Sequence, residues 1–114
     1  MRQIEQQMLA AIHQREDWSC DNTRVQVTYF AHGARMIDRV SVYLHGNHIA
    51  QIEPNSVAVN ACGWKTTTTK SRLNAILREF CNAGIYQKNK QWYGYDQQHE
   101  FTVDGDASYV FARV

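Results

Sequence analysis

The tetrapeptide HGNH at residues 45–48 places two histidines on either side of a Gly-Asn pair, and imidazole nitrogens are common metal ligands. Cys62 or Cys81 could complete such a site, because thiolates also bind zinc. No paired-cysteine or HExxH motif accompanies these residues, and the Gly-Asn pair is typical of a tight turn. Two histidines in a solvent-exposed turn explain the pattern more simply. We therefore predict neither a metal site nor any other cofactor.

Nucleophilic catalysis would need Cys62 or Cys81 beside one of the five histidines. No nucleophile-elbow motif surrounds either thiol, and Cys81 follows Phe80 in an apolar helical pattern, which is typical of a small buried side chain. The sequence also lacks a phosphate-binding loop, because Gly63 has no second spaced glycine before a Lys-Ser/Thr pair. We expect the protein not to be an enzyme.

Four acidic residues gather near the end of the sequence: Asp96, Glu100, Asp104 and Asp106. A carboxylate pair could catalyse hydrolysis or bind a divalent cation. Turn formation and solubility explain these residues more simply, since aspartate is a common turn residue. The acidic residues therefore support no catalytic prediction.

Basic residues gather between positions 65 and 90. This window contains six of them and a single acid, Glu79, so its formal charge is +5. The whole chain, in contrast, has 12 basic and 11 acidic residues and a net charge of +1. A basic segment within a mildly acidic remainder is typical of a surface that meets a polyanion.

An expected helix brings part of this charge together. Lys70, Asn74 and Arg78 recur at i, i+4 and i+8 and so share one helix face, and hydroxyls and lysines at a helix start favour phosphate. The hairpin expected next interleaves lysines with tyrosines and a tryptophan, which could stack on unpaired bases. A solvated helix face and core aromatics would explain the same residues. The predicted nucleic-acid-binding residues are Lys65, Thr69, Lys70, Arg72, Asn74, Arg78, Lys88, Lys90, Trp92 and Tyr93.

Two amphipathic helices are expected to position these residues. Apolar residues with a 3.6-residue period predict a first helix over about 2–16. A second and clearer apolar stripe predicts a central helix over about 69–83. Thr68 or Thr69 is the expected N-cap, and Gly84 is the expected C′ residue that ends the helix.

Alternating apolar and polar residues predict strands both before and after the central helix. Four strands are expected before it, a hairpin with its turn at 88–90 after it, and short strands near 101–103 and 108–114. Residues 17–22 read as a polar loop. Residues 31–38 read as a connection or, alternatively, as a strand that continues through a bulge at Gly33.

The expected fold is therefore α+β, in a single domain that spans residues 1–114. A mainly antiparallel sheet of about five to six strands carries the central helix on one face. No apolar run is long enough for a signal peptide or a bilayer span, and the three cysteines show no close pairing. We expect reduced thiols, an intracellular location and no membrane partner.

Three sequence blocks carry a family resemblance: VYLHGNHIAQI at 42–52, GWKTTTTKSRLNAIL at 63–77 and YQKNKQWY at 86–93. They resemble a family of small, largely uncharacterised proteins encoded by tailed bacteriophages and related mobile elements. Members of that family carry LHGN-x-IA, then GW-x-T-x-TTKSRLNA, then QK and WY. The resemblance implies a phage or prophage protein that acts in the host bacterial cytoplasm, and it implies no catalytic residue.

Two functions from different classes follow. The first is a nucleic-acid-binding accessory protein that uses the surface around residues 65–93 to bind DNA or RNA. The alternative is a protein-binding inhibitor of a host system, such as an anti-CRISPR or other anti-defence protein, whose C-terminal acids mimic phosphates toward a host bacterial protein. The four acids are few for such mimicry, so nucleic-acid binding ranks first. A virion or assembly component has no specific signal, and the final strand could pair with a second copy to form a homodimer.

Overall fold

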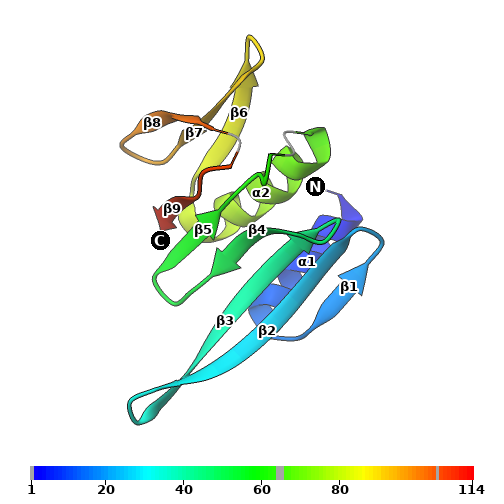
Figure 1. The fold of residues 1–114 in the computed structure, drawn as a ribbon, viewed down its shortest axis with the longest axis vertical. Coiled ribbons are helices and arrows are strands. Elements are labelled where there is room, and N and C mark those ends of the chain that lie inside the picture. Colours follow the sequence, from blue (N-terminus) through cyan, green and yellow to red (C-terminus); the bar gives the residue numbers. More distant parts are fainter. Residues whose placement is uncertain (1, 64–65, 105) are drawn as a thin grey trace.

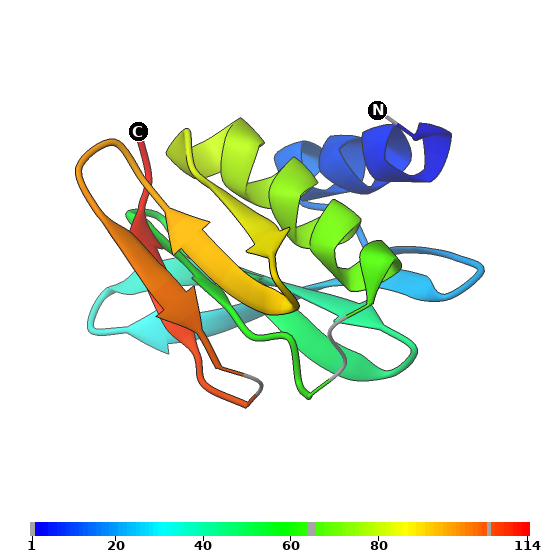
Figure 2. The same cartoon turned by 90° about the horizontal axis from the view of Figure 1, so that it is seen from above.

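The computed structural model describes residues 2–63, 66–104 and 106–114. Two helices lie on one face of a six-stranded antiparallel sheet, and a three-stranded antiparallel sheet lies beside the second helix (Figures 1 and 2). This arrangement confirms the predicted α+β fold with a mainly antiparallel sheet. The elements are α1 (Gln3–Gln14), β1 (Trp18–Cys20), β2 (Thr23–His32), β3 (Arg35–Leu44), β4 (Asn47–Ile52), β5 (Ser56–Val59), α2 (Thr67–Cys81), β6 (Gly84–Lys88), β7 (Gln91–Tyr95), β8 (Glu100–Val103) and β9 (Tyr109–Ala112).

The larger sheet has the order β1-β2-β3-β4-β5-β9, so neighbouring strands within β1–β5 are also neighbours in the sequence. The chain then leaves this sheet, forms α2 and the smaller sheet β6-β7-β8, and returns as β9 at the edge beside β5. The edge strand predicted within 108–114 is therefore confirmed. In the described part of the chain, no helix is both long enough and apolar enough to cross a bilayer.

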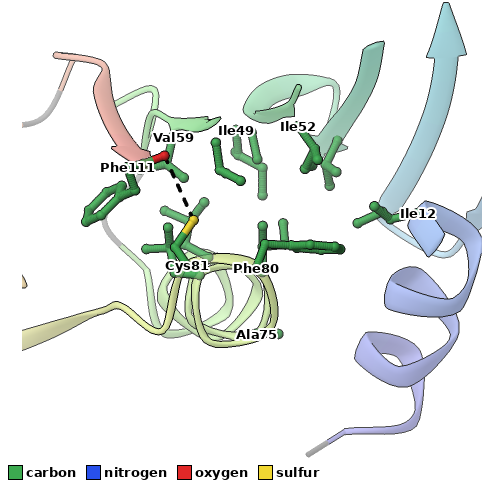
Figure 3. Packing of buried hydrophobic residues seen from close by; sticks show 14 of the residues in the cluster. Ile12, Ile49, Ile52, Val59, Ala75, Phe80, Cys81 and Phe111 are labelled. Carbon is green, nitrogen blue, oxygen red and sulfur yellow. Dashed lines mark hydrogen bonds between the residues drawn. The ribbon is translucent and has the colours of Figure 1, made fainter. Parts of the chain in front are cut away.

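The apolar core lies between the larger sheet and the helices. Ile49, Ile52 and Val59 of the sheet face Phe80 and other apolar residues of α2 (Figure 3). Removing such side chains from water is the dominant stabilising term in a domain of this size. The core therefore fixes how α2 lies across the sheet, and with it which α2 residues face outward.

Cys81, in the last turn of α2, is part of this core and 1% exposed. Its Sγ points toward the carbonyl oxygen of Phe111 on β9 (Figure 3). Burial raises the pKa of the Cys81 thiol to about 11. A thiol that stays protonated at neutral pH is a poor nucleophile, which agrees with the expectation that Cys81 packs as a small apolar side chain.

The ends of α2 differ from the prediction. Thr66 is the N-cap, because its hydroxyl oxygen accepts the Thr69 N–H at 3.1 Å, so the expected cap at Thr68 or Thr69 is wrong. Asn82, with φ of 50°, ends the helix in the left-handed conformation that asparagine tolerates. The predicted C′ residue, Gly84, instead begins β6.

Two strand predictions also need correction. Most of the expected connection at 31–38 is strand, because β2 and β3 pair along ten residues each. Gly33, whose φ is 64°, lies in the turn between these strands and not in the alternative bulge. The resulting hairpin projects from one end of the molecule (Figure 1). The expected polar loop at 17–22 contains the short strand β1, which pairs with the start of β2.

Candidate functional site

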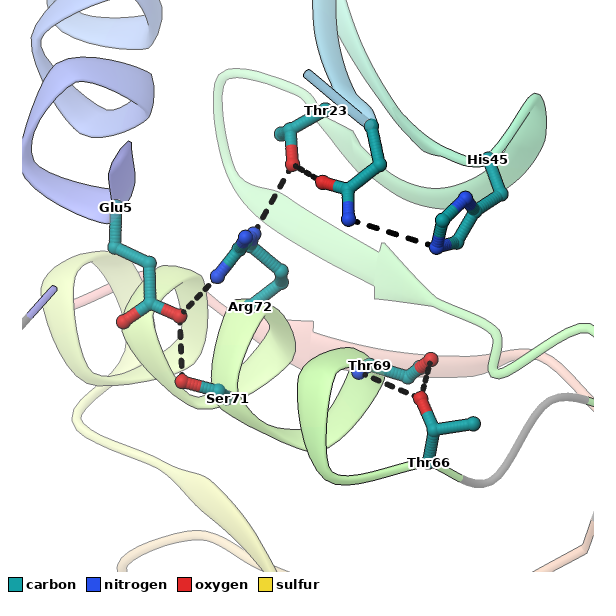
Figure 4. A network of polar contacts seen from close by, with 8 residues as sticks. Glu5, Thr23, His45, Thr66, Thr69, Ser71 and Arg72 are labelled. Atoms are coloured by element: carbon teal, nitrogen blue, oxygen red, sulfur yellow. Dashed lines mark hydrogen bonds and ion pairs between the residues drawn. The ribbon is translucent and has the colours of Figure 1, made fainter. Parts of the chain in front are cut away.

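Arg72 is the clearest departure from the predicted basic surface. Its side chain is 4% exposed and its Nη1 lies 2.8 Å from Oε2 of Glu5 on α1, which is equally buried. The Ser71 hydroxyl also donates to Glu5, and Arg72 Nε donates to the hydroxyl of Thr23 on β2 (Figure 4). Arg72 therefore ties α1, α2 and β2 together inside the fold and has no surface to offer a phosphate.

Two further predicted residues lie in the interior. Thr69 and Trp92 are each 1% exposed. The Thr69 hydroxyl lies 3.0 Å from that of Thr66 at the start of α2 (Figure 4). Trp92 is among the largest fully buried side chains of the chain. Both side chains therefore lie below the outer surface of the molecule.

Four predicted cations remain at the surface. Lys70 is half-buried on α2, Arg78 is exposed two helical turns further along, and Lys88 and Lys90 are exposed at the β6–β7 turn. None of the four belongs to an ion pair with any residue that the structure describes. They are therefore free to meet an anionic partner. The remaining predicted cation, Lys65, lies outside the described residues.

Asn74, which lies between Lys70 and Arg78 on α2, holds a strand of the smaller sheet. Its amide Nδ2 donates to the Ile85 carbonyl oxygen at 2.8 Å, and its Oδ1 accepts the Ile85 N–H at 2.6 Å. These bonds fasten the outer edge of β6 to α2. The smaller sheet is thus joined to α2 at this point, and Figure 2 shows β6 running alongside α2.

Three tyrosines share the outer face of the smaller sheet. Because side chains alternate along a strand, the burial of Trp92 turns Tyr93 and Tyr95 of β7 to the opposite side. Tyr86 of β6 pairs with Tyr93 across the strands, and their rings stack with centroids 5.2 Å apart and planes at 22°. The Tyr95 ring lies 6.1 Å from that of Tyr86. All three are half-buried; together we call them the tyrosine face.

Sequence reasoning grouped Trp92 with Tyr93 although adjacent strand residues face opposite sides. The period-2 alternation within β7 was the signal that could have separated them. The same alternation places Lys88, two residues after Tyr86, on the side of the tyrosine face. The structure therefore buries one predicted aromatic residue, Trp92, and brings Tyr86 and Tyr95 together with Tyr93.

The acidic residues near the end of the chain have different roles. The Tyr86 hydroxyl donates to Glu100 on β8, and this hydrogen bond is the main reason why the pKa of Tyr86 is raised to about 12. The Asp96 carboxylate accepts the backbone N–H groups of Gln98 and His99, which lowers its pKa. Asp96 is thus a turn-former, as expected for an aspartate between two strands.

The HGNH tetrapeptide spans the turn between β3 and β4 and the first two residues of β4. His45, with φ of 51°, and Gly46, with φ of 80°, are the turn residues, and the His48 ring stacks on Tyr43. The Cys62 thiol points to the His48 carbonyl oxygen rather than to its ring; burial, aided by the charge of Asp106, raises its pKa. Among the described residues, no three His, Cys, Asp or Glu side chains converge closely enough to hold a metal ion.

Comparison with protein families identifies a match. The family model described as Kyanoviridae Gp96 protein matches residues 1–109. The three sequence blocks between residues 42 and 93 fall within the matched span. No curated protein and no solved structure matches the chain.

Proposed function

The chain belongs to the Kyanoviridae Gp96 protein family, a family of phage proteins, and on this premise we propose that it is a non-enzymatic accessory protein that binds single-stranded nucleic acid. The binding surface is the tyrosine face together with the neighbouring cations Lys70, Arg78, Lys88 and Lys90. The phage origin implied by the three sequence blocks agrees with this family. The place of action that we propose is the cytoplasm of the host bacterium.

The stacked pair of Tyr86 and Tyr93 is the observation that carries the proposal. The chain leaves these rings half-exposed on one face of a small sheet, while it buries the neighbouring tryptophan. Flat exposed rings can stack on unpaired bases, and each such contact contributes roughly 1–3 kcal/mol by alanine substitution. In a duplex, stacking on the neighbouring base pairs covers the flat faces of the bases. The tyrosine face therefore favours a single strand.

The nearby cations are suited to a modest electrostatic contribution. Four unpaired cations could neutralise about four phosphates. For single strands each phosphate contact contributes about −0.7 to the slope of log affinity against log salt. We therefore expect a slope of no more than about −3. Such a weak slope distinguishes this surface from the extended basic clefts of duplex-binding proteins.

Fluorescence anisotropy with labelled single- and double-stranded DNA and RNA, measured across salt concentrations, tests the proposal. Tyr93→Ala should weaken single-strand binding without changing the salt slope. Lys88→Ala with Lys90→Ala should weaken binding to every sequence and reduce the slope by about 1 to 2. Lys70→Ala with Arg78→Ala should act in the same direction.

Matched controls lie on the β2–β3 hairpin, far from the smaller sheet (Figure 1). Tyr29 is 59% exposed and Arg35 is also exposed, so Tyr29→Ala and Arg35→Ala remove the same chemical groups elsewhere. Their binding should equal that of the unchanged protein. Absence of binding at low salt, or an equal loss in the control variants, would refute the tyrosine face as the binding surface.

The alternative remains an inhibitor of a host system that uses the C-terminal acids. The carboxylates of Glu100 and Asp96 already accept hydrogen bonds within the fold. Asp104 and Asp106, which are both exposed, are the acids that remain for a host protein. Two carboxylates make a small phosphate mimic, so this alternative ranks second. If no nucleic acid binds, a host-lysate pull-down with the Asp104→Lys, Asp106→Lys variant as control tests it directly.

A further inference from the structure

A pocket of about 210 Å³ lies between the β3–β4 turn and the start of α2. Its apolar walls are Leu44, Ile49 and Ala61, each 3% exposed or less. These residues come from three separate segments that the larger sheet and the core hold in place. The pocket therefore has firm apolar walls.

The rim of the pocket is polar. His45 contributes from the β3–β4 turn and Asn47 from the start of β4, while Thr66, Thr68 and Thr69 contribute from the start of α2. Within the described residues, neither the half-buried Asn47 amide nor the Thr68 hydroxyl has a hydrogen-bond partner. These two groups are thus available to hydrogen-bond a ligand at the mouth of the pocket.

A chain of contacts fixes the rim. The His45 N–H donates to the Asn22 carbonyl oxygen at 2.8 Å, and the His45 ring lies 3.5 Å from the Asn22 amide. Asn22 in turn accepts from the Thr23 hydroxyl, which accepts from the buried Arg72 (Figure 4). The rim is therefore connected to the Arg72–Glu5 ion pair, and such pre-organisation lowers the entropic cost of binding.

Size and polarity define the ligand. An apolar cavity of about 150 Å³ holds one benzene ring, whereas pockets for drug-sized ligands begin at about 300 Å³. A volume of about 210 Å³ lies between these values and suits one planar ring system. The described lining consists of apolar, hydroxyl, amide and imidazole side chains, which suit an uncharged ring.

We propose that this pocket binds one adenine base, with the Asn47 amide on the edge of the ring. An asparagine amide offers one donor and one acceptor, the complement of adenine N7 and N6. The Thr68 hydroxyl can donate or accept at the same rim. The adenine comes either from a free nucleoside or from a bound strand, and only the second source rests on the proposed function.

Adenosine titrated at millimolar concentration into ¹⁵N-labelled protein tests this proposal by amide chemical shifts, with uridine as the comparison. Adenosine should shift the amides of Asn47, Ala61 and Thr66 to Thr69 and bind at least tenfold more tightly than uridine. Thr68→Leu, which fills the rim, and Asn47→Ala should each weaken adenosine binding about tenfold. Thr67→Leu is the matched control, because Thr67 is exposed on the same turn and does not line the pocket.

A second titration with short oligo(dA) and oligo(dT) identifies the source. A preference for oligo(dA) that Asn47→Ala abolishes would place a strand base in the pocket, and adenosine binding without such a preference would assign it to a free nucleoside. Absence of pocket shifts with adenosine, or equal binding by the Thr68→Leu variant, would overturn the proposal. Either result would leave the test of the tyrosine face unaffected, because that test uses Tyr93→Ala.

Discussion

The side-chain amide of Asn74 on α2 satisfies both backbone groups of Ile85 on β6, at 2.6 and 2.8 Å. An edge strand normally presents such groups to water or to another strand, and here a helix residue takes that place. Next to this contact, the Tyr95 hydroxyl lies 2.6 Å from where a Cβ at Gly84 would be. A side chain at position 84 would displace Tyr95, so Gly84 allows the tyrosine face to approach α2.

Asn74→Ala should therefore destabilise the protein. The substitution leaves a buried N–H and a carbonyl without partners, which costs about 1–3 kcal/mol, and urea unfolding measures the change. Lys70→Ala, one turn earlier on α2, is the control and should change the free energy of unfolding by less than about 0.5 kcal/mol. Equal stability of the two variants would show that the Asn74 contact does not hold β6.

Arg72→Met should lower the free energy of unfolding more than the substitution of any exposed cation does. It leaves the carboxylate of Glu5 buried without its charged partner, with only the Ser71 hydroxyl still donating to it, and breaking such a pair costs about 3–5 kcal/mol. Adding Glu5→Leu should restore much of the stability, because apolar replacements of a whole buried pair are often neutral. A double-mutant cycle by urea unfolding measures this coupling. Arg78→Ala, which removes an exposed arginine from the same helix, is the control, and additive effects at Arg72 and Glu5 would contradict the ion pair.

The Arg72–Glu5 ion pair is a feature that the sequence alone could not predict. The local period of α2 correctly placed Arg78 on an exposed face, and the alternation of residues 85–95 correctly predicted the β6–β7 hairpin. Arg72 is two residues from Lys70 on the helix, and its burial depends on Glu5, which is 67 residues away. A tertiary partner of this kind leaves no local pattern. The strand β1 was also not predicted, because its three residues are too few to show an alternation of apolar and polar side chains. Its pairing with β2 defines it as a strand.

Trp92→Ala should destabilise the protein much more than Tyr93→Ala, because Trp92 is a core residue and Tyr93 a surface residue. Deletion of the buried indole should cost about 3–5 kcal/mol of stability. Loss of the half-buried Tyr93 ring, which stacks on Tyr86, should cost only about 1 kcal/mol. Urea unfolding compares the two variants, and the proposed function predicts that Tyr93→Ala loses single-strand affinity while it stays folded. A stable Trp92→Ala variant would contradict the burial of Trp92.

Thr66→Ala tests the cap among the consecutive threonines. It removes the oxygen that accepts the Thr69 N–H, and loss of a threonine N-cap typically costs about 1 kcal/mol. Thr66→Ser should keep most of the stability because serine caps equally well. Thr67→Ala alters an exposed position on the same turn and should change little. A larger effect of Thr67→Ala than of Thr66→Ala in thermal unfolding would assign the cap elsewhere.

The Tyr86–Glu100 contact should make the tyrosine face sensitive to alkaline pH. The hydrogen bond to Glu100, together with partial desolvation and the neighbouring Tyr93, raises the pKa of Tyr86 from its ordinary value of 10.0 to about 12. A group whose pKa is higher in the folded state contributes stability that is complete below the unfolded pKa. This contribution is therefore present below pH 10 and is lost as the pH rises through about 12.

Ultraviolet absorbance of tyrosinate measures this ionisation, with circular dichroism to confirm that the chain stays folded. A step near pH 12 should disappear in Tyr86→Phe and move to lower pH in Glu100→Gln, since the neutral amide no longer disfavours the phenolate. Tyr29→Phe, which removes an exposed tyrosine on β2, should leave the step unchanged. If the step persists in Tyr86→Phe, it belongs to another residue. That result would contradict an effect of Glu100 on the ionisation of Tyr86.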